Sequence, residues 1–176
     1  MTDQEYQHPI TSFGGYKYPQ PPLVGIEPGA VLYSAGIGTD ATHDLAFGLN
    51  FDMNIVMIDP SPHSISYVGQ VMHVINNGTL PEEKIICKEA LMIELASRVK
   101  NGETRNSNFS FLPVGLYTEN GEATFYRPKN ASDVASYSMY STFRGSHHEY
   151  VDFQASVLSL SQIMKIQGHS KIDILK

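Results

Sequence analysis

Residues 30–41 read AVLYSAGIGTDA, and this stretch decides the fold. A short continuous apolar run, residues 30–33, leads into a glycine-rich turn, which is the pattern of a strand buried on both faces. A helical pattern over residues 43–51 follows, and then a second apolar run, residues 54–58, which ends at Asp59. We therefore expect a strand, a tight turn, a helix and a parallel strand, with the turn and Asp59 at the same edge of a sheet.

The glycine turn and Asp59 together predict a nucleoside-binding site. Glycines let the backbone turn sharply and let a ligand approach the main chain at the N-terminus of the next helix. Asp59 lies 21 residues after Gly38. From the end of the neighbouring strand, its carboxylate can accept hydrogen bonds from both hydroxyls of a ribose.

The rest of the chain alternates between helical and strand-like patterns. The expected helices cover residues 63–76, 79–100 (opened by a capping box at Thr79-Leu80-Pro81-Glu82) and 158–168. The expected strands cover residues 110–117, 123–126, 136–140, 150–157 and 172–175. Asn120-Gly121 predicts a hairpin turn between the first two of these strands. The fold class is therefore α/β, with a mostly parallel sheet and an antiparallel insert at roughly residues 118–157.

Composition favours a single globular domain in the cytoplasm. The 176 residues include 12 Lys and Arg against 18 Asp and Glu, so a net charge of −6 gives no basic footprint for nucleic acid. The single cysteine, Cys87, forms no internal disulfide, and no apolar stretch has the length of a membrane span or signal peptide. Residues 1–28, rich in Pro and Tyr, are expected to form an arm, and residues 29–176 the domain.

The spacing of the glycine turn leaves the class of nucleoside open. Gly36, Gly38 and Ala41 satisfy the dinucleotide fingerprint, so a nicotinamide-dependent oxidoreductase is an alternative. Asp40 weighs against it, because a carboxylate in this turn opposes a pyrophosphate anion, whereas it suits a ligand that carries an ammonium group. Asp40 could equally serve as a helix cap with no ligand at all.

Four segments, in this order, resemble the FkbM-type S-adenosylmethionine-dependent methyltransferases. They are Val31-Leu32-Tyr33-Ser34-Ala35-Gly36-Ile37-Gly38-Thr39-Asp40, Ile58-Asp59-Pro60-Ser61-Pro62, Phe111-Leu112-Pro113-Val114-Gly115-Leu116 with Asn120-Gly121 and Phe125-Tyr126, and residues 168–176. The resemblance runs from about residue 30 to the end of the chain. It implies a Rossmann-like methyltransferase sheet and transfer of a methyl group from S-adenosylmethionine to a hydroxyl of a sugar or another small molecule.

The resemblance also implies a role for each site residue. The turn that wraps the methionine part of the cofactor would contain Ser34, Ala35, Gly36, Gly38 and Asp40. Asp59 would hold the ribose, with Pro60 and Ser61 beside the adenosine and with Gly115 and Leu116 near the adenine.

The chain departs from the family after Lys176, where the family continues into an acidic segment and the remaining strands of the sheet. We therefore expect the C-terminal strands to be missing and the last strand to present an edge through which the chain could form an oligomer. This departure supports a third hypothesis, a shortened, non-catalytic nucleoside-binding module.

No catalytic base is assigned. His147 or His148, beside Glu149, could take a proton from the acceptor hydroxyl, but exposed loop histidines are the favoured interpretation. No metal site is predicted, because adjacent ligands on a strand do not converge. The expected partner is a small hydroxylated molecule, with no nucleic acid and no membrane.

Overall fold

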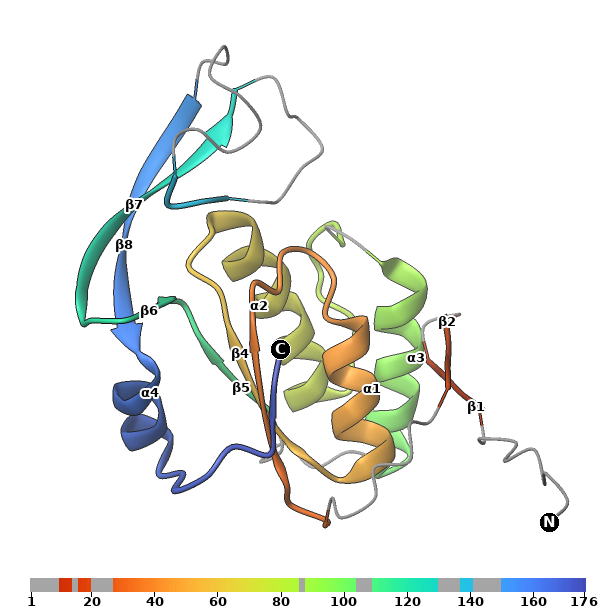
Figure 1. Ribbon diagram of the computed structural model, residues 1–176. Coiled ribbons are helices and arrows are strands. Elements are labelled where there is room, and N and C mark those ends of the chain that lie inside the picture. Colours follow the sequence, from red (N-terminus) through yellow and green to blue (C-terminus); the bar gives the residue numbers. More distant parts are fainter. Residues whose placement is uncertain are drawn as a thin grey trace, which may run out of the picture.

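The chain folds as a central parallel sheet with helices on both faces and a smaller mixed sheet at one end (Figure 1). The computed structural model describes residues 10–13, 16–19, 27–85, 88–103, 109–129, 137–140 and 150–176. This arrangement confirms the predicted α/β class with a parallel sheet.

The central sheet has four parallel strands in the order β5–β4–β3–β9. They are β3 (Val31–Ala35), β4 (Asn54–Ile58), β5 (Phe109–Leu112) and β9 (Ile174–Leu175). The central pair, β3 and β4, is almost entirely buried, as its continuous apolar sequence predicts. The chain adds β4 and β5 on one side of β3 and β9 on the other. The strand order therefore reverses at β3, whose carboxyl end is the place where open α/β sheets bind ligands.

Helices cover both faces of this sheet (Figure 1). On one face lie α1 (Thr42–Phe51), α2 (Pro62–Asn77) and α3 (Glu89–Lys100). Their apolar residues form the larger core cluster together with Leu32, Ile55 and Met57 of the sheet. On the other face lies α4 (Leu160–Gln167), where Ile163 belongs to a smaller cluster with the alternate sheet residues Tyr33 and Ile58. The alternation of strand side chains thus divides the core into two layers.

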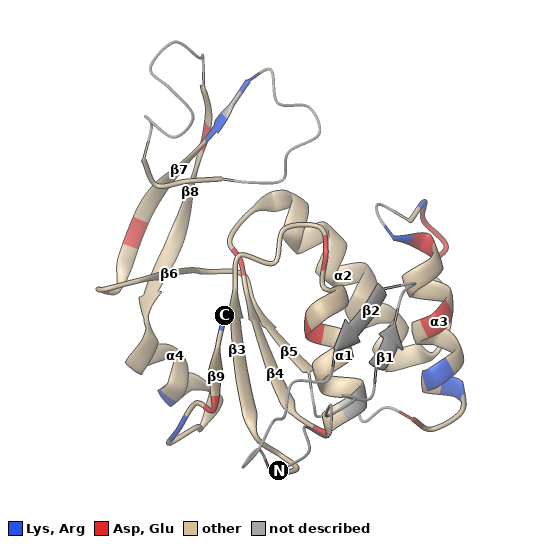
Figure 2. Ribbon diagram, turned by 45° about the vertical axis from the view of Figure 1, so that its right-hand side comes forward, with Lys and Arg blue, Asp and Glu red and all other residues tan. Residues whose placement is uncertain are grey.

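The smaller sheet stands above the carboxyl ends of the central strands (Figure 2). It contains β6 (Gly115–Tyr117), β7 (Gly121–Pro128) and β8 (Tyr150–Ser159) in the order β6–β8–β7. The β7–β8 pair is antiparallel, as expected for the insert, whereas β6 and β8 run parallel.

The predicted hairpin at Asn120-Gly121 is wrong, because β8 lies between the two strands that this turn connects. Gly115 of β6 and Gly121 of β7 both pair with Val157 of β8. The Asn120 side-chain oxygen accepts a hydrogen bond from the Ser159 amide at 2.9 Å, so the turn wraps around the end of β8. The strand expected over residues 110–117 is also divided, since β5 ends at Leu112 and β6 begins at Gly115.

The helix expected from residue 79 begins only at Glu89. The Gln70 side-chain amide donates a hydrogen bond to the Lys84 carbonyl at 3.0 Å. In a helix this carbonyl would accept a backbone N–H from the next turn, so the tertiary bond takes the place of a helical hydrogen bond. Lys88, immediately before the helix, has a left-handed backbone with φ of 56°, which interrupts any helix that arrives from the capping box.

Outside the two sheets, β1 (Ile10–Phe13) and β2 (Tyr16–Pro19) pair as an antiparallel hairpin within the expected arm. None of the helices in the described segments combines the length and the hydropathy that crossing a membrane requires. Among the described strands β9 lies at an edge of the central sheet, and its pairing with another copy stays a prediction.

Asp173 fastens the start of β9 to the start of β3 and makes stability depend on pH. Its carboxylate accepts the Val31 N–H at 2.8 Å and the Lys171 ammonium at 3.0 Å. The hydrogen bond from Val31 is the largest cause that lowers the pKa of Asp173 below its usual value of 3.8. Because the folded-state pKa is depressed, this stabilisation is present above the unfolded-state pKa and is lost as the pH falls through the folded-state pKa.

We therefore expect Asp173→Asn to be less stable than the native chain at neutral pH. The difference should shrink below pH 3.8, where the native carboxylate also takes up its proton. Urea unfolding followed by circular dichroism across this pH range measures the difference. A difference in stability that does not change with pH would contradict the assignment.

Candidate functional site

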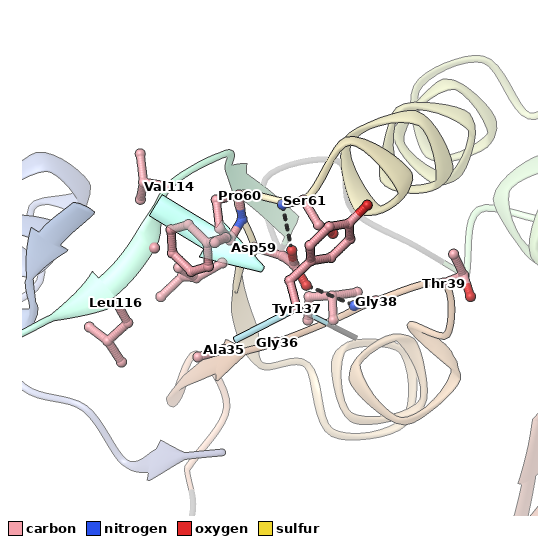
Figure 3. Close-up of a pocket in the computed structure, with 14 residues that line it drawn as sticks. Ala35, Gly36, Gly38, Thr39, Asp59, Pro60, Ser61, Val114, Leu116 and Tyr137 are labelled. Atoms are coloured by element: carbon pink, nitrogen blue, oxygen red, sulfur yellow. Dashed lines mark hydrogen bonds between the residues drawn. The ribbon is translucent and has the colours of Figure 1, made fainter. Parts of the chain in front are cut away.

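A cavity of about 630 Å³ lies at the carboxyl ends of β3 and β4. Its walls come from the turns after these two strands, the start of β6, the middle of β7 and Tyr137 (Figure 3). Eight of the ten predicted site residues line it, namely Ala35, Gly36, Gly38, Asp59, Pro60, Ser61, Gly115 and Leu116. The two segments with the most specific sequence signals therefore meet at one cavity.

The glycine turn exposes its main chain to this cavity. Gly36 and Gly38 have left-handed backbones, with φ of 77° and 61°, which side chains disfavour. The Gly36 N–H donates to the Ile58 carbonyl at 2.9 Å and so fixes the start of the turn against the end of β4. A Cβ atom at Gly36 would meet nothing within 4 Å. The space beside this backbone is thus open to a ligand.

Asp59 joins the two turns that form the floor of the cavity (Figure 3). One carboxylate oxygen accepts the Gly38 N–H at 2.9 Å, and the other accepts the Ser61 N–H at 2.8 Å. The residue is only 6% exposed yet lines the cavity. A carboxylate has about four acceptor positions, so each oxygen retains capacity for a further donor. Asp59 is therefore rigidly placed with its remaining acceptors beside the open space.

Serine hydroxyls complete the support of the floor. Ser61 caps α2, because its hydroxyl accepts the Ser64 N–H at 3.3 Å. The Ser64 hydroxyl donates to the Gly38 carbonyl at 2.6 Å. Asp59 therefore binds the Gly38 N–H, and Ser64 binds the Gly38 carbonyl. Because the turn is fixed in this way, it should lose little conformational entropy when a ligand binds.

Asp40 does not line the cavity. Its carboxylate accepts hydrogen bonds from the Thr42 N–H, at 3.1 Å, and from the Thr42 hydroxyl, and it forms an ion pair with Lys88 at 3.2 Å. Burial raises the pKa of Asp40, but the hydrogen bonds from Thr42 and Lys88 outweigh burial and leave it below its usual value. The helix-cap alternative is wrong as stated, because the cap position of α1 is Ala41, which makes no side-chain cap bond. Asp40 lies one residue before the cap and bonds Thr42, and Lys88 matches its charge within the fold.

Ser34 lies behind the cavity, inside the core. Its side chain is fully buried, and its hydroxyl has no hydrogen-bond partner among the described residues. The neighbouring Ala35, which points to the other face of the strand, does line the cavity. Only the second of these two predicted residues is therefore placed to contact a ligand.

Gly115 is required by packing as well as by the cavity. A Cβ atom at this position would lie 2.7 Å from Phe125 and 2.9 Å from Val157. The absence of a side chain lets β6 approach the β7–β8 pair closely. This approach places Leu116 and Phe125 in one apolar wall of the cavity.

Sequence reasoning missed Phe125 and Tyr137 as lining residues. Phe125 lies in the middle of β7, within a strand that the sequence does predict. Tyr137 comes from residues 136–140, which are expected to form a strand. Of this segment the structure describes residues 137–140, which contribute a single backbone bridge, between Ser138 and Tyr126, and this bridge positions Tyr137. The enrichment of tyrosine in the insert was the only signal that pointed to it.

Among the described residues that line the cavity, none is assigned as a catalytic base. The predicted candidates His147, His148 and Glu149 lie outside the described residues. Within the described segments, no three His, Cys, Asp or Glu side chains gather closely enough to hold a metal ion.

Comparison of the chain with protein-family models, with curated proteins and with solved structures found no match. The function of the cavity is therefore inferred from its own residues.

Proposed function

We propose that the chain is an S-adenosylmethionine-dependent methyltransferase that acts on a hydroxyl of a sugar or another small molecule. The observation that carries this proposal is Asp59, a buried carboxylate that fixes the glycine turn and retains acceptors toward the cavity. Hydroxyl groups of a ribose are the donors that such a carboxylate suits. The strand order, with its reversal at β3, supports a Rossmann-like sheet around this site.

The residues present fit a nucleoside with an amino-acid tail. Asp59 would hold the ribose, and the open space beside the Gly36 backbone would leave room for the tail. When bound, the cofactor supplies an activated methyl group. The protein mainly aligns this group with the acceptor hydroxyl, and alignment alone contributes strongly to an in-line displacement.

The start of α1 disfavours the nicotinamide alternative. A dinucleotide site presents helix N-terminal N–H groups to the pyrophosphate. Here the Ala41 N–H donates to the Tyr67 hydroxyl at 3.2 Å, and the Thr42 N–H donates to Asp40. These donors are occupied, and the Asp40 carboxylate takes the place that favours an anion. The first two donors of α1 are therefore not available to a pyrophosphate.

Calorimetric titration with S-adenosylhomocysteine, and separately with NADH, tests the proposal. We expect saturable binding of S-adenosylhomocysteine by the native chain and none of NADH. Asp59→Asn should weaken the binding roughly tenfold, because the amide cannot make the charge-assisted hydrogen bonds of the carboxylate. Asp173→Asn is the matched control, since Asp173 also accepts a backbone N–H but lies at the opposite end of β3.

Three outcomes decide between the hypotheses. Binding of NADH in place of S-adenosylhomocysteine would establish the dinucleotide alternative. Equal weakening by both variants would mean that Asp59 acts only through folding. Binding of S-adenosylhomocysteine without methyl transfer to any member of a panel of hydroxylated compounds would favour the non-catalytic nucleoside-binding module.

A further inference from the structure

The strand order places three chemically different segments side by side at the carboxyl ends of the central strands. The open glycine turn follows β3, Asp59 follows β4, and Val114 and Leu116 follow β5, the strand beside β4. A nucleoside that Asp59 holds by its ribose has its tail on one side and its base on the other. Because the polar main chain of the glycine turn suits the tail, the base must lie toward β5 and β6.

The walls at this end of the cavity are apolar and aromatic. Val114, Leu116 and Phe125 come from the β5–β6 connection, β6 and β7. Tyr137 comes from the connection between β7 and β8. It adjoins this wall through Phe153, whose ring it meets edge-on and which stacks on Phe125, and its own ring lies beside Asp59 in Figure 3. Flat heteroaromatic bases stack on aromatic side chains with little regard for their hydrogen-bonding edges. The composition of this wall therefore matches a nucleobase better than it matches the polar tail.

Tyr137 is held in a defined position by its neighbours. The Ser138 N–H donates to the Tyr126 carbonyl at 3.0 Å, and the Tyr126 N–H donates to the Ser138 carbonyl at 2.7 Å. The Tyr137 ring meets the Phe153 ring edge-on, with centroids 4.9 Å apart, and the Arg127 guanidinium lies 5.6 Å from its centroid. An aromatic ring fixed on several sides loses little entropy when it contacts a ligand.

We propose that Tyr137 is a specificity-determining residue that closes the cavity over the nucleobase of the bound nucleoside. The proposal rests on the proposed function, because it takes the ribose position from Asp59. It adds that the insert, and not only the central sheet, builds the nucleoside site.

Calorimetry with S-adenosylhomocysteine and with adenosine tests this placement on the full chain. Tyr137→Ala should weaken both ligands by the same factor, roughly tenfold, because both carry the base. Tyr137→Phe keeps the ring and should bind nearly as the native chain does. Tyr117→Ala is the matched control, since Tyr117 is 46% exposed on β6 and does not line the cavity.

A fluorescent reporter gives a second readout that does not depend on affinity. The chain contains no tryptophan, so Tyr137→Trp introduces a single indole at the proposed contact. Its emission should change on titration with adenosine, whereas the emission of a Tyr117→Trp variant should stay constant. Stacking of the base on the indole is the physical cause of this change.

The failure of this inference is distinguishable from failure of the proposed function. If the native chain binds S-adenosylhomocysteine, and Tyr137→Ala binds it equally well with no response from the indole, Tyr137 does not contact the base. If Tyr137→Ala weakens S-adenosylhomocysteine but leaves adenosine unchanged, the residue contacts the tail and the placement is overturned. If the native chain binds neither ligand, the proposed function itself fails.

Discussion

Replacing Gly48 with alanine should destabilise the protein by about 2 kcal/mol, whereas the same replacement at Gly69 should stabilise it by about 0.5–1 kcal/mol. Both glycines lie within helices, where alanine is normally the better residue. At Gly48 of α1, however, a Cβ atom would lie 2.4 and 2.6 Å from two ring atoms of Phe109. At Gly69 of α2 it would meet nothing within 4 Å. The sign of the effect therefore depends on the close approach of α1 to β5.

Urea unfolding followed by circular dichroism measures both variants. Combining Gly48→Ala with Phe109→Leu should cost less than the sum of the two single changes, because the smaller side chain leaves room for the added methyl group. Gly69→Ala controls for the general effect of alanine in a helix. A stabilising Gly48→Ala would mean that Phe109 moves aside freely and that the packing of α1 on β5 is looser than described.

The two strands that carry the site could be predicted because their signals are local. A continuous apolar run of four or five residues that ends in glycines or in Asp59 indicates a buried parallel strand whatever the rest of the chain does. Because consecutive parallel strands of this kind end at the same edge of a sheet, the pattern also predicts that the glycine turn and Asp59 lie close together. The contact of Asp40 is also local, because its carboxylate bonds the Thr42 N–H two residues later. The sequence does not distinguish this contact from a contact with a ligand, because both place an aspartate just before a helix.

The parts that could not be predicted depend on contacts between distant residues. Asn120-Gly121 has the local signature of a hairpin, yet β8, which arrives about 30 residues later, pairs with both flanking strands. Tyr137 lines the cavity only because Ser138 bridges to Tyr126 of β7. Ser34 is a different case, because the alternation that directs its side chain into the core is local. The resemblance assigned a ligand role to the whole glycine-turn segment without regard to this alternation.

Lys176→Met is expected to destabilise the protein by about 3 kcal/mol, because it leaves a buried carboxylate without its counter-ion. Asp44, in the first turn of α1, is fully buried, and both of its oxygens accept hydrogen bonds from the Lys176 ammonium, at 3.1 and 3.2 Å. The Lys176 backbone extends the pairing of β9 with β3, since its N–H donates to Tyr33 and its carbonyl accepts from Ala35. A side-chain replacement leaves this backbone pairing intact, so the variant isolates the ion pair.

The matched control is Lys171→Met. The Lys171 side chain is 72% exposed in its ion pair with Asp173, so its replacement should cost much less stability than that of Lys176. Combining Lys176→Met with Asp44→Leu should restore much of the lost stability, because an apolar pair replaces a broken ionic one.

His43 provides a spectroscopic check of the same ion pair. The pKa of His43 lies below its usual value mainly because the ring is buried. The negative charge of Asp44 raises this pKa, and the positive charge of Lys176 lowers it. Its pKa, followed by nuclear magnetic resonance, should therefore rise in Lys176→Met. An unchanged stability together with an unchanged His43 titration would show that Lys176 does not neutralise Asp44.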